Sequence, residues 1–183
     1  MIQESVLVKN IPDVIAKAHA MAVEKGWWDN PDRPWAEQHN NFYGEVAEAW
    51  EEYRAGRMNI WFEPMGNGTA FGDKPEGFWV EIADLLIRMG DTLGKYKVVT
   101  LLLDHDSGKI KDDVSFIANL YRELAKIAAG PDGDFRNMLD VSSWIFSDCF
   151  NYAKKSGVDL YDIISVKMSY NQTRSRRHGN KKA

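Results

Sequence analysis

The sequence predicts an all-α fold, a single multi-helix bundle over residues 1–183. Three observations carry this prediction. Apolar residues recur at helical spacing along most of the chain, no long segment alternates apolar and polar residues, and prolines and glycines fall where helices would begin and end. Only the short runs VLVKNI and KVVTLLL are ambiguous between helix and strand.

Punctuating residues place the first two helices. One helix is predicted over residues 11–25, where a proline opens the first turn and Gly26 follows the last. A second is predicted over residues 35–54, because Pro34 can open it and Gly56 stands just past its end.

The middle of the chain combines a long loop with an unusually apolar helix. Residues 57–75 are rich in glycine and proline and predict a loop, and loops of this length in compact domains are usually functional or disordered. The next helix, predicted over residues 76–95, is apolar on nearly every side and is therefore expected to be central and buried.

Three more helices complete the expected bundle. They are predicted over residues 111–129, 135–155 and 159–173, with a GPDGD turn between the first two and Asp159 as the N-cap of the last.

A degenerate internal duplication is a further possibility. When EEYRAG is laid on AKIAAG, Glu45, Glu48 and Glu52 fall opposite Asn119, Arg122 and Lys126. A separate match of EIAD to NMLD sets Glu81 and Asp84 opposite Asn137 and Asp140, so the second half would be a copy that has lost most of its acids.

Composition is that of a globular protein, with 44% apolar and 27% charged residues. No apolar run approaches the roughly 18 residues of a membrane span, so no membrane partner is expected. The N-terminus lacks the basic-then-apolar order of a secretion signal. The single cysteine, Cys149, excludes an internal disulfide and a cysteine-based zinc site. These features predict a cytoplasmic location.

Charge is distributed unevenly along the chain. Residues 174–183 hold five of the 23 basic side chains and none of the 27 acids, so the first 173 residues carry a formal charge of −9. Nucleic-acid binding is disfavoured, because a duplex requires a broad basic face. The basic tail is either a disordered solubilising end or a separate electrostatic device.

Acidic residues on two neighbouring helices form the main candidate site. At about 100° per residue, Glu45, Glu48 and Glu52 lie within roughly 60° of one another, at the border of an apolar stripe. On the next helix Glu81 and Asp84 are neighbours in an apolar setting, where an ionised carboxylate is costly unless a cation compensates it.

A metal ion and an internal ion pair are the two ways to compensate these acids. Carboxylate ligands favour Mg²⁺ or Mn²⁺. Arg88 lies on the Glu81/Asp84 face and offers neutralisation without metal. A di-iron bundle is set aside, since none of the four histidines lies three residues after a glutamate.

Three blocks of sequence resemble a known superfamily. GEVAEAWEEYRAG, KPEGFWVEIADLLIRMGD and KMSYNQTRSRRHGNKK are similar, in order and spacing, to the MazG-like and dimeric dUTPase-like all-α nucleoside triphosphate pyrophosphohydrolases, in particular phage and bacterial MazG-like proteins. The resemblance covers much of residues 44–182. It implies a helical bundle, usually a homodimer, that hydrolyses an NTP or dNTP to the monophosphate and pyrophosphate, for example to remove an unwanted nucleotide.

The resemblance also implies roles for individual residues. It places Mg²⁺, with Mn²⁺ as an alternative, and the orientation of the attacking water on four acids: Glu45, Glu48, Glu81 and Asp84. It places the phosphates and the nucleotide on three residues near the C-terminus: Lys167, Asn171 and Arg174. One departure is visible, because Gly44 stands where the fuller motif has another glutamate, which leaves that role to Glu52 or a different group.

Other residues complete the expected site. The basic tail is expected to fold over the triphosphate as a lid, and four tryptophans near the acidic helices are candidates for stacking on the base, namely Trp27, Trp28, Trp35 and Trp61. Asn41, one turn before Glu45, is a candidate for reading a base edge. The alternative to an enzyme is a non-catalytic helical module of the same descent, which binds a nucleotide or a protein partner.

Overall fold

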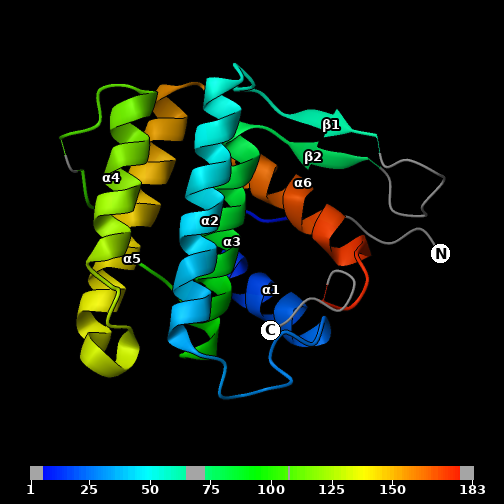
Figure 1. Ribbon diagram of the computed structural model, residues 1–183, viewed down its shortest axis with the longest axis vertical. Helices are drawn as coiled ribbons and strands as arrows, with labels where there is room; N and C mark the ends of the chain where they lie inside the picture. The colour runs from blue at the N-terminus through cyan, green and yellow to red at the C-terminus, as the bar shows by residue number, and fades with distance from the viewer. Residues whose placement is uncertain (1–5, 65–72, 107, 178–183) are drawn as a thin grey trace.

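The computed structural model describes residues 6–64, 73–106 and 108–177 and confirms the all-α class (Figure 1). In these ranges the chain forms helices and one small antiparallel sheet. The helices are α1 (Ile11–Glu24), α2 (Trp35–Arg54), α3 (Phe78–Lys95), α4 (Asp113–Ala125), α5 (Pro131–Lys155) and α6 (Leu160–Thr173), and the strands are β1 (Trp61–Glu63) and β2 (Lys74–Glu76).

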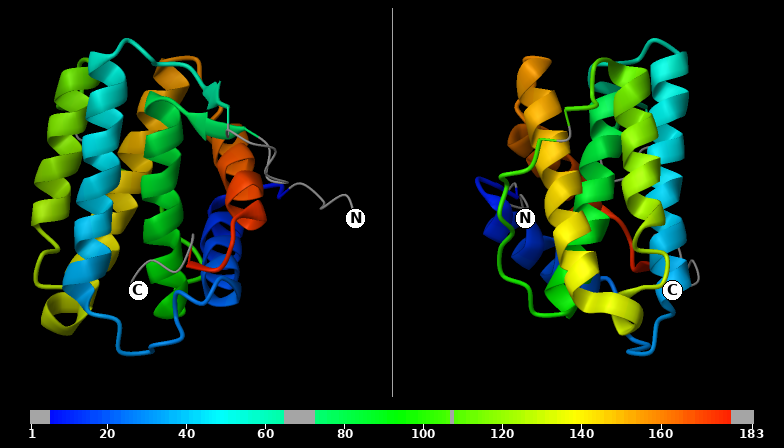
Figure 2. Two further views of the ribbon diagram at one scale, coloured as in Figure 1. Left: turned by 45° about the vertical axis from the view of Figure 1, so that its right-hand side comes forward. Right: turned by 90° about the vertical axis from the view of Figure 1, so that its left-hand side faces the viewer.

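Helix α3 is the centre of the fold, as its apolar sequence predicts. It packs against α1 and α6 on one flank and against α2 and α5 on the other (Figure 2). Helices α2, α4 and α5 run alongside it in both views (Figures 1 and 2). Most α3 side chains are buried, so an acid on this helix lies within or beside the core.

The predicted loop after α2 contains a hairpin, which corrects the expectation of a strand-free segment. Strand β1 pairs with β2 so that Trp61 lies opposite Glu76. Gly77 then turns the chain into α3 with φ of 123°, a conformation that favours glycine. The turn lets the amide of Phe78 donate to the carbonyl of Arg57, which ties the start of α3 to the end of α2.

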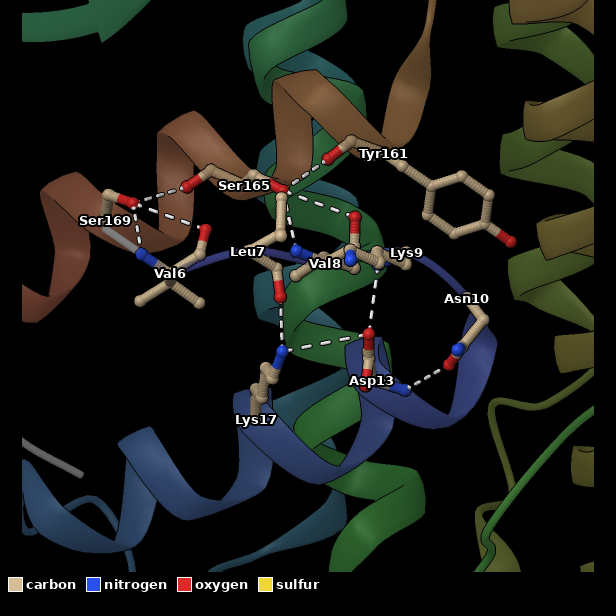
Figure 3. Close-up of polar contacts among 10 residues, drawn as sticks. All are labelled: Val6, Leu7, Val8, Lys9, Asn10, Asp13, Lys17, Tyr161, Ser165 and Ser169. Atoms are coloured by element: carbon tan, nitrogen blue, oxygen red, sulfur yellow. Dashed lines mark hydrogen bonds and ion pairs between the residues drawn. The ribbon is translucent and has the colours of Figure 1, made fainter. Parts of the chain in front are cut away.

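The extended segment before α1 is fastened to α6 (Figure 3). The amide of Val6 donates to the Ser169 hydroxyl at 2.8 Å, and the amide of Val8 donates to the Ser165 hydroxyl at 2.9 Å. Each hydroxyl also donates to the carbonyl one turn earlier in α6. Residues 6–10 of the ambiguous VLVKNI run are thus neither strand nor helix, and the backbone amides of Val6 and Val8 are satisfied by serine side chains.

Helix boundaries differ most from the prediction around the GPDGD segment. Helix α4 ends at Ala125, earlier than expected, and α5 begins at Pro131, inside the predicted turn. Pro131 suits a first helical turn, and Asp134, with φ of −161°, marks a kink before the straight part of α5. The turn and the helix start therefore overlap.

Two further expectations concern the whole chain. Among the described ranges, every helix is too short or too polar to cross a bilayer. The internal duplication stays a prediction. Asn119, the counterpart of Glu45 in that alignment, is buried in α4 and donates to Asp148 of α5 at 2.7 Å.

Candidate functional site

Three carboxylates from two helices converge beside the core. Glu45 comes from α2, and Glu81 and Asp84 come from α3, with one oxygen of each within 4.8 Å of the others. Glu45 is 4% exposed and Glu81 is 2% exposed. The convergence follows from local sequence, because Glu45 borders the buried stripe of α2 while Glu81 and Asp84 share one face of the central helix.

Helix α6 supplies a buried cation to this cluster. The Lys167 ammonium lies 3.0 Å from Oδ2 of Asp84 and donates to the Pro75 carbonyl at 3.3 Å. The Asn171 amide nitrogen, one turn later, donates to Oδ1 of Asp84 at 3.3 Å. The structure thus brings Lys167 and Asn171 onto the acids, although the resemblance places them on phosphates.

Arg88 compensates a different acid from the one that its helical position predicts. Its Nε donates to Oε1 of Glu45, across the interface between α3 and α2. This contact lies at the edge of the cluster, and 39% of the Arg88 side chain is exposed. The internal ion pair therefore exists, and Glu45 is its acid.

The cluster is only partly compensated. Burial, opposed by Arg88 and reinforced by Asp84, raises the pKa of Glu45 to about 7. Burial, opposed by Lys167, raises the pKa of Glu81 to about 10. Burial would raise the pKa of Asp84 as well, but Lys167 and Arg88 outweigh it and hold that pKa below its usual value. Without a further cation, the cluster holds protons near neutral pH.

The other two acids that the sequence places on the Glu45 face of α2 lie outside the close group. Glu48 is exposed, but its charge is near enough to Glu45 to raise the pKa of Glu45. Glu52 accepts from Arg57 Nε at 2.8 Å and from the Trp61 indole at 2.9 Å. Both partners of Glu52 lie beyond the end of α2, one of them in the hairpin. Glu52 therefore does not suit the role of the additional glutamate that Gly44 replaces.

A cavity lies directly beside the cluster, between α1, α2, α3 and the end of α6. Asp84 and Arg88 belong to both the cluster and the cavity wall. The cavity-lining residues are Ala18, Met21, Ala22, Lys25, Trp27, Arg33, Gln38, Asn41, Phe42, Asp84, Ile87, Arg88, Asp91, Thr92, Asn171 and Arg174. Four cationic side chains thus face two acidic ones, which makes the cavity suited to an anion.

Several cavity residues carry no recognisable sequence signal. Arg33 comes from the segment between α1 and α2, where no periodicity applies, while Lys25 directly follows α1, at the last position of the predicted helix. Gln38, in contrast, lies one helical turn before Asn41, and its amide oxygen accepts from the Thr92 hydroxyl at 3.0 Å. Helical spacing from Asp84 along α3 identifies Arg88, and one further turn of the same spacing could have identified Thr92.

The tryptophans divide between this cavity and other duties. Trp27 lines the cavity, whereas the Trp28 indole donates to Asp91 at 2.7 Å. Trp35 donates to the Ile127 carbonyl at 3.1 Å and Trp61 to Glu52, so both lie away from it. Of the residues expected to contact a base, Trp27 and Asn41 line the cavity.

The start of the basic tail is fastened to the segment after α1. Arg176 and Arg177 both pair with Asp29, and Arg177 Nε donates to the Gly26 carbonyl at 2.9 Å. Arg174 reaches the cavity. The rest of the expected lid, residues 178–183, lies outside the described residues.

One buried polar atom of the site lacks a partner among the described residues. Asn171 is 9% exposed, and its Oδ1 accepts no hydrogen bond. A buried acceptor of this kind costs free energy unless something supplies a donor or a cation. Asn171 lines the cavity beside Asp84, so a donor or cation that satisfied its Oδ1 would lie at this site.

Comparisons with known proteins add nothing to this geometry. Models of protein families, curated proteins and solved structures were each searched, and none matches the chain. The superfamily therefore stays a prediction that rests on the quoted motifs.

Proposed function

We propose that the protein is a Mg²⁺-dependent nucleoside triphosphate pyrophosphohydrolase, which converts an NTP or dNTP to the monophosphate and pyrophosphate. The observation that carries this proposal is the buried group of Glu45, Glu81 and Asp84 beside a cavity with four cationic side chains. Metal-assisted phosphate chemistry needs a site for a divalent cation directly next to a site for the anionic substrate, and this cluster and cavity are neighbours.

The residues fit a hard divalent cation. The donor set consists of carboxylate oxygens, which suit Mg²⁺ or Mn²⁺ and not the softer transition metals. The raised pKa values of Glu45 and Glu81 indicate that the ionised forms of these buried carboxyls lack sufficient compensating positive charge. The unpartnered Oδ1 of Asn171 adds a neutral oxygen at the same place.

The chain's own residues supply the rest of the chemistry. When bound, the ion would neutralise phosphate charge and lower the pKa of a bound water. Lys167 holds Asp84 in place and ionised, and the acids of the cluster orient the water and accept its proton. A water oriented by these acids would attack the α-phosphorus as the bond from that phosphorus to the α,β-bridging oxygen breaks, and the electron pair of the broken bond would leave with pyrophosphate.

The cavity accounts for the other parts of the substrate. Arg174 and Lys25 offer donors to the phosphates, and developing charge on the leaving group is stabilised by such donors. Trp27 and Phe42 offer apolar surface to the base. The amides of Asn41 and Gln38 are the polar groups at that surface.

A non-catalytic nucleotide-binding module is the second candidate. The Arg88–Glu45 pair favours it, because an acid already neutralised by arginine needs no metal. Gly44 points the same way, since it lacks the acid that the motif has. This candidate predicts nucleotide binding without pyrophosphate release.

The decisive experiment measures pyrophosphate release from a panel of ribo- and deoxyribonucleoside triphosphates with Mg²⁺ and with EDTA. We expect release that requires Mg²⁺ and that falls more than about 100-fold in Asp84→Asn, since loss of outer-shell residues alone costs up to that much. Glu51→Gln is the matched control, because Glu51 is an exposed acid of α2. Undiminished turnover by Asp84→Asn, with helical circular dichroism intact, contradicts the proposal.

Glu48 is tested in the same assay. The resemblance makes it a ligand, while the structure leaves it exposed outside the close group. A loss in Glu48→Gln as large as in Asp84→Asn supports a role for Glu48 in holding metal. A loss as small as in Glu51→Gln restricts the site to the buried acids. The homodimer is checked separately by sedimentation velocity.

A further inference from the structure

Arg88 connects the acid cluster to the cavity. Its Nε donates to Glu45, its side chain lines the cavity, and 39% of that side chain is exposed. The Glu45 carboxylate accepts this hydrogen bond from across the interface between α2 and α3. Arg88 thus serves as the counterion of Glu45 in the metal-free protein.

This pairing conflicts with metal binding by Glu45. A bound Mg²⁺ lies about 2.1 Å from each ligand oxygen, so its two charges and the guanidinium would share one carboxylate. Like charges at such a distance repel strongly where water is scarce. Glu45 is 4% exposed, which leaves little solvent to screen the repulsion.

The cavity gives Arg88 another place without movement of the backbone. A long, partly exposed side chain on the wall can rotate toward the cavity about its own bonds. There it would join Lys25, Arg33 and Arg174. Asp84 and Asp91 balance only part of the charge of these four cations, so a bound phosphate group would favour this second position.

We propose that Arg88 exchanges partners, pairing with Glu45 in the metal-free protein and with the polyphosphate once Glu45 holds the metal. The inference rests on the proposed function and names a further substrate-binding residue for it. The exchange keeps a buried glutamate compensated before loading. It also makes metal and polyphosphate binding favour each other, because each removes a cost of the other.

Side-chain NMR observes the exchange directly. In ¹⁵N-labelled protein the Arg88 Nε–Hε signal is assigned as the one missing from Arg88→Lys. We expect it to be shifted by the carboxylate in EDTA, to move on addition of Mg²⁺, and to move again on addition of a triphosphate with a non-hydrolysable α,β-methylene bridge. The Arg57 signal serves as the internal reference, since Arg57 Nε donates to Glu52 at 2.8 Å and Arg57 does not line the cavity.

Affinities for the same analogue give the second readout. Arg88→Met is expected to weaken binding about tenfold with Mg²⁺, as loss of a charge-assisted hydrogen bond implies, and to change it little in EDTA. Arg33→Met is the matched control. Its effect on affinity should be the same with Mg²⁺ and with EDTA, because Arg33 has no contact with the acid cluster.

The outcomes separate this inference from the proposed function. If Mg²⁺ and the analogue together shift the backbone signals of Glu81 and Asp84 but leave the Arg88 Nε–Hε signal in place, the exchange is wrong and the metal site stands. Equal losses for Arg88→Met with Mg²⁺ and with EDTA also overturn it. If neither Mg²⁺ nor the analogue moves any signal, both proposals fall.

Discussion

Lys167 of α6 lies 3.0 Å from Asp84 of α3, with 2% of the lysine side chain exposed. Burial lowers the pKa of a lysine, but Asp84 and Glu81 outweigh it and keep the Lys167 pKa above its usual value. The pair is therefore ionised, and it joins the last helix to the central one. It also keeps Asp84 charged, which a metal ligand must be.

Replacing Lys167 with methionine should destabilise the protein by about 3 kcal/mol, because breaking a buried pair leaves an uncompensated charge. Urea unfolding followed by circular dichroism in EDTA measures the loss. The double variant Lys167→Met/Asp84→Asn is the control and should regain part of the stability, since the orphaned charge is gone. A loss below about 0.5 kcal/mol, typical of a surface pair, would contradict the buried pairing.

Stability of the metal-free protein should fall as pH rises. Unfolding returns Glu45 and Glu81 to a pKa of 4.5, whereas burial raises the folded values to about 7 and about 10. The folded state then binds more protons between these limits, so the free energy of unfolding decreases from pH 4.5 to 7 through Glu45 and on to 10 through Glu81.

Urea unfolding at about pH 5, 7 and 9 checks this slope, with EDTA and with Mg²⁺. The variant Glu81→Gln should show a flatter decline in EDTA, because its amide does not titrate. Excess Mg²⁺ should reverse the trend, since the metal competes with protons for the same oxygens. A wild-type curve as flat as that of Glu81→Gln would show that Glu81 keeps an ordinary pKa.

Gly77→Ala should cost more stability than Gly56→Ala. Both glycines have positive φ, but a Cβ at Gly77 would lie 2.4 Å from the Asn59 carbonyl oxygen, whereas Gly56 has open space. We expect about 1 kcal/mol for Gly56→Ala and about 3 kcal/mol for Gly77→Ala. Thermal unfolding measures both, and equal costs would show that the hairpin yields freely.

Gly44→Ala should stabilise the protein. Gly44 lies inside α2, and no atom lies within 4 Å of an added Cβ. Alanine in a helix interior is favoured over glycine by about 1 kcal/mol, so the melting temperature should rise. Pyrophosphate release should be unchanged. If activity falls while stability rises, the space beside Gly44 is occupied by substrate or by water during the reaction.

The helical fold follows from the sequence to different degrees in different places. Helix α2 has the predicted bounds, because Pro34 and the Gly56 segment stop the helix at both ends. The hairpin was not predicted, since each strand has three residues and is too short to show alternation. At Pro131 a turn-rich composition and a helix start overlap, and composition alone favours the turn.

The site divides in the same way. Convergence of Glu45 with Glu81 and Asp84 is predictable, because buried acids on adjacent helices need compensating partners and can share one site. The partner of Arg88 is not, since it depends on how α2 and α3 are rotated against each other. The contribution of Arg33 depends on the path of an irregular segment, which spacing does not specify.

The position of α6 after the helices that carry the acids has a consequence for biosynthesis. Glu45, Glu81 and Asp84 leave the ribosome well before Lys167 does. During translation the growing bundle therefore carries acids whose permanent counterion has not yet been made. Free Mg²⁺ in the surrounding solution would be the cation at hand in that interval, so the supply of this ion would bear on the yield of folded protein as well as on its activity.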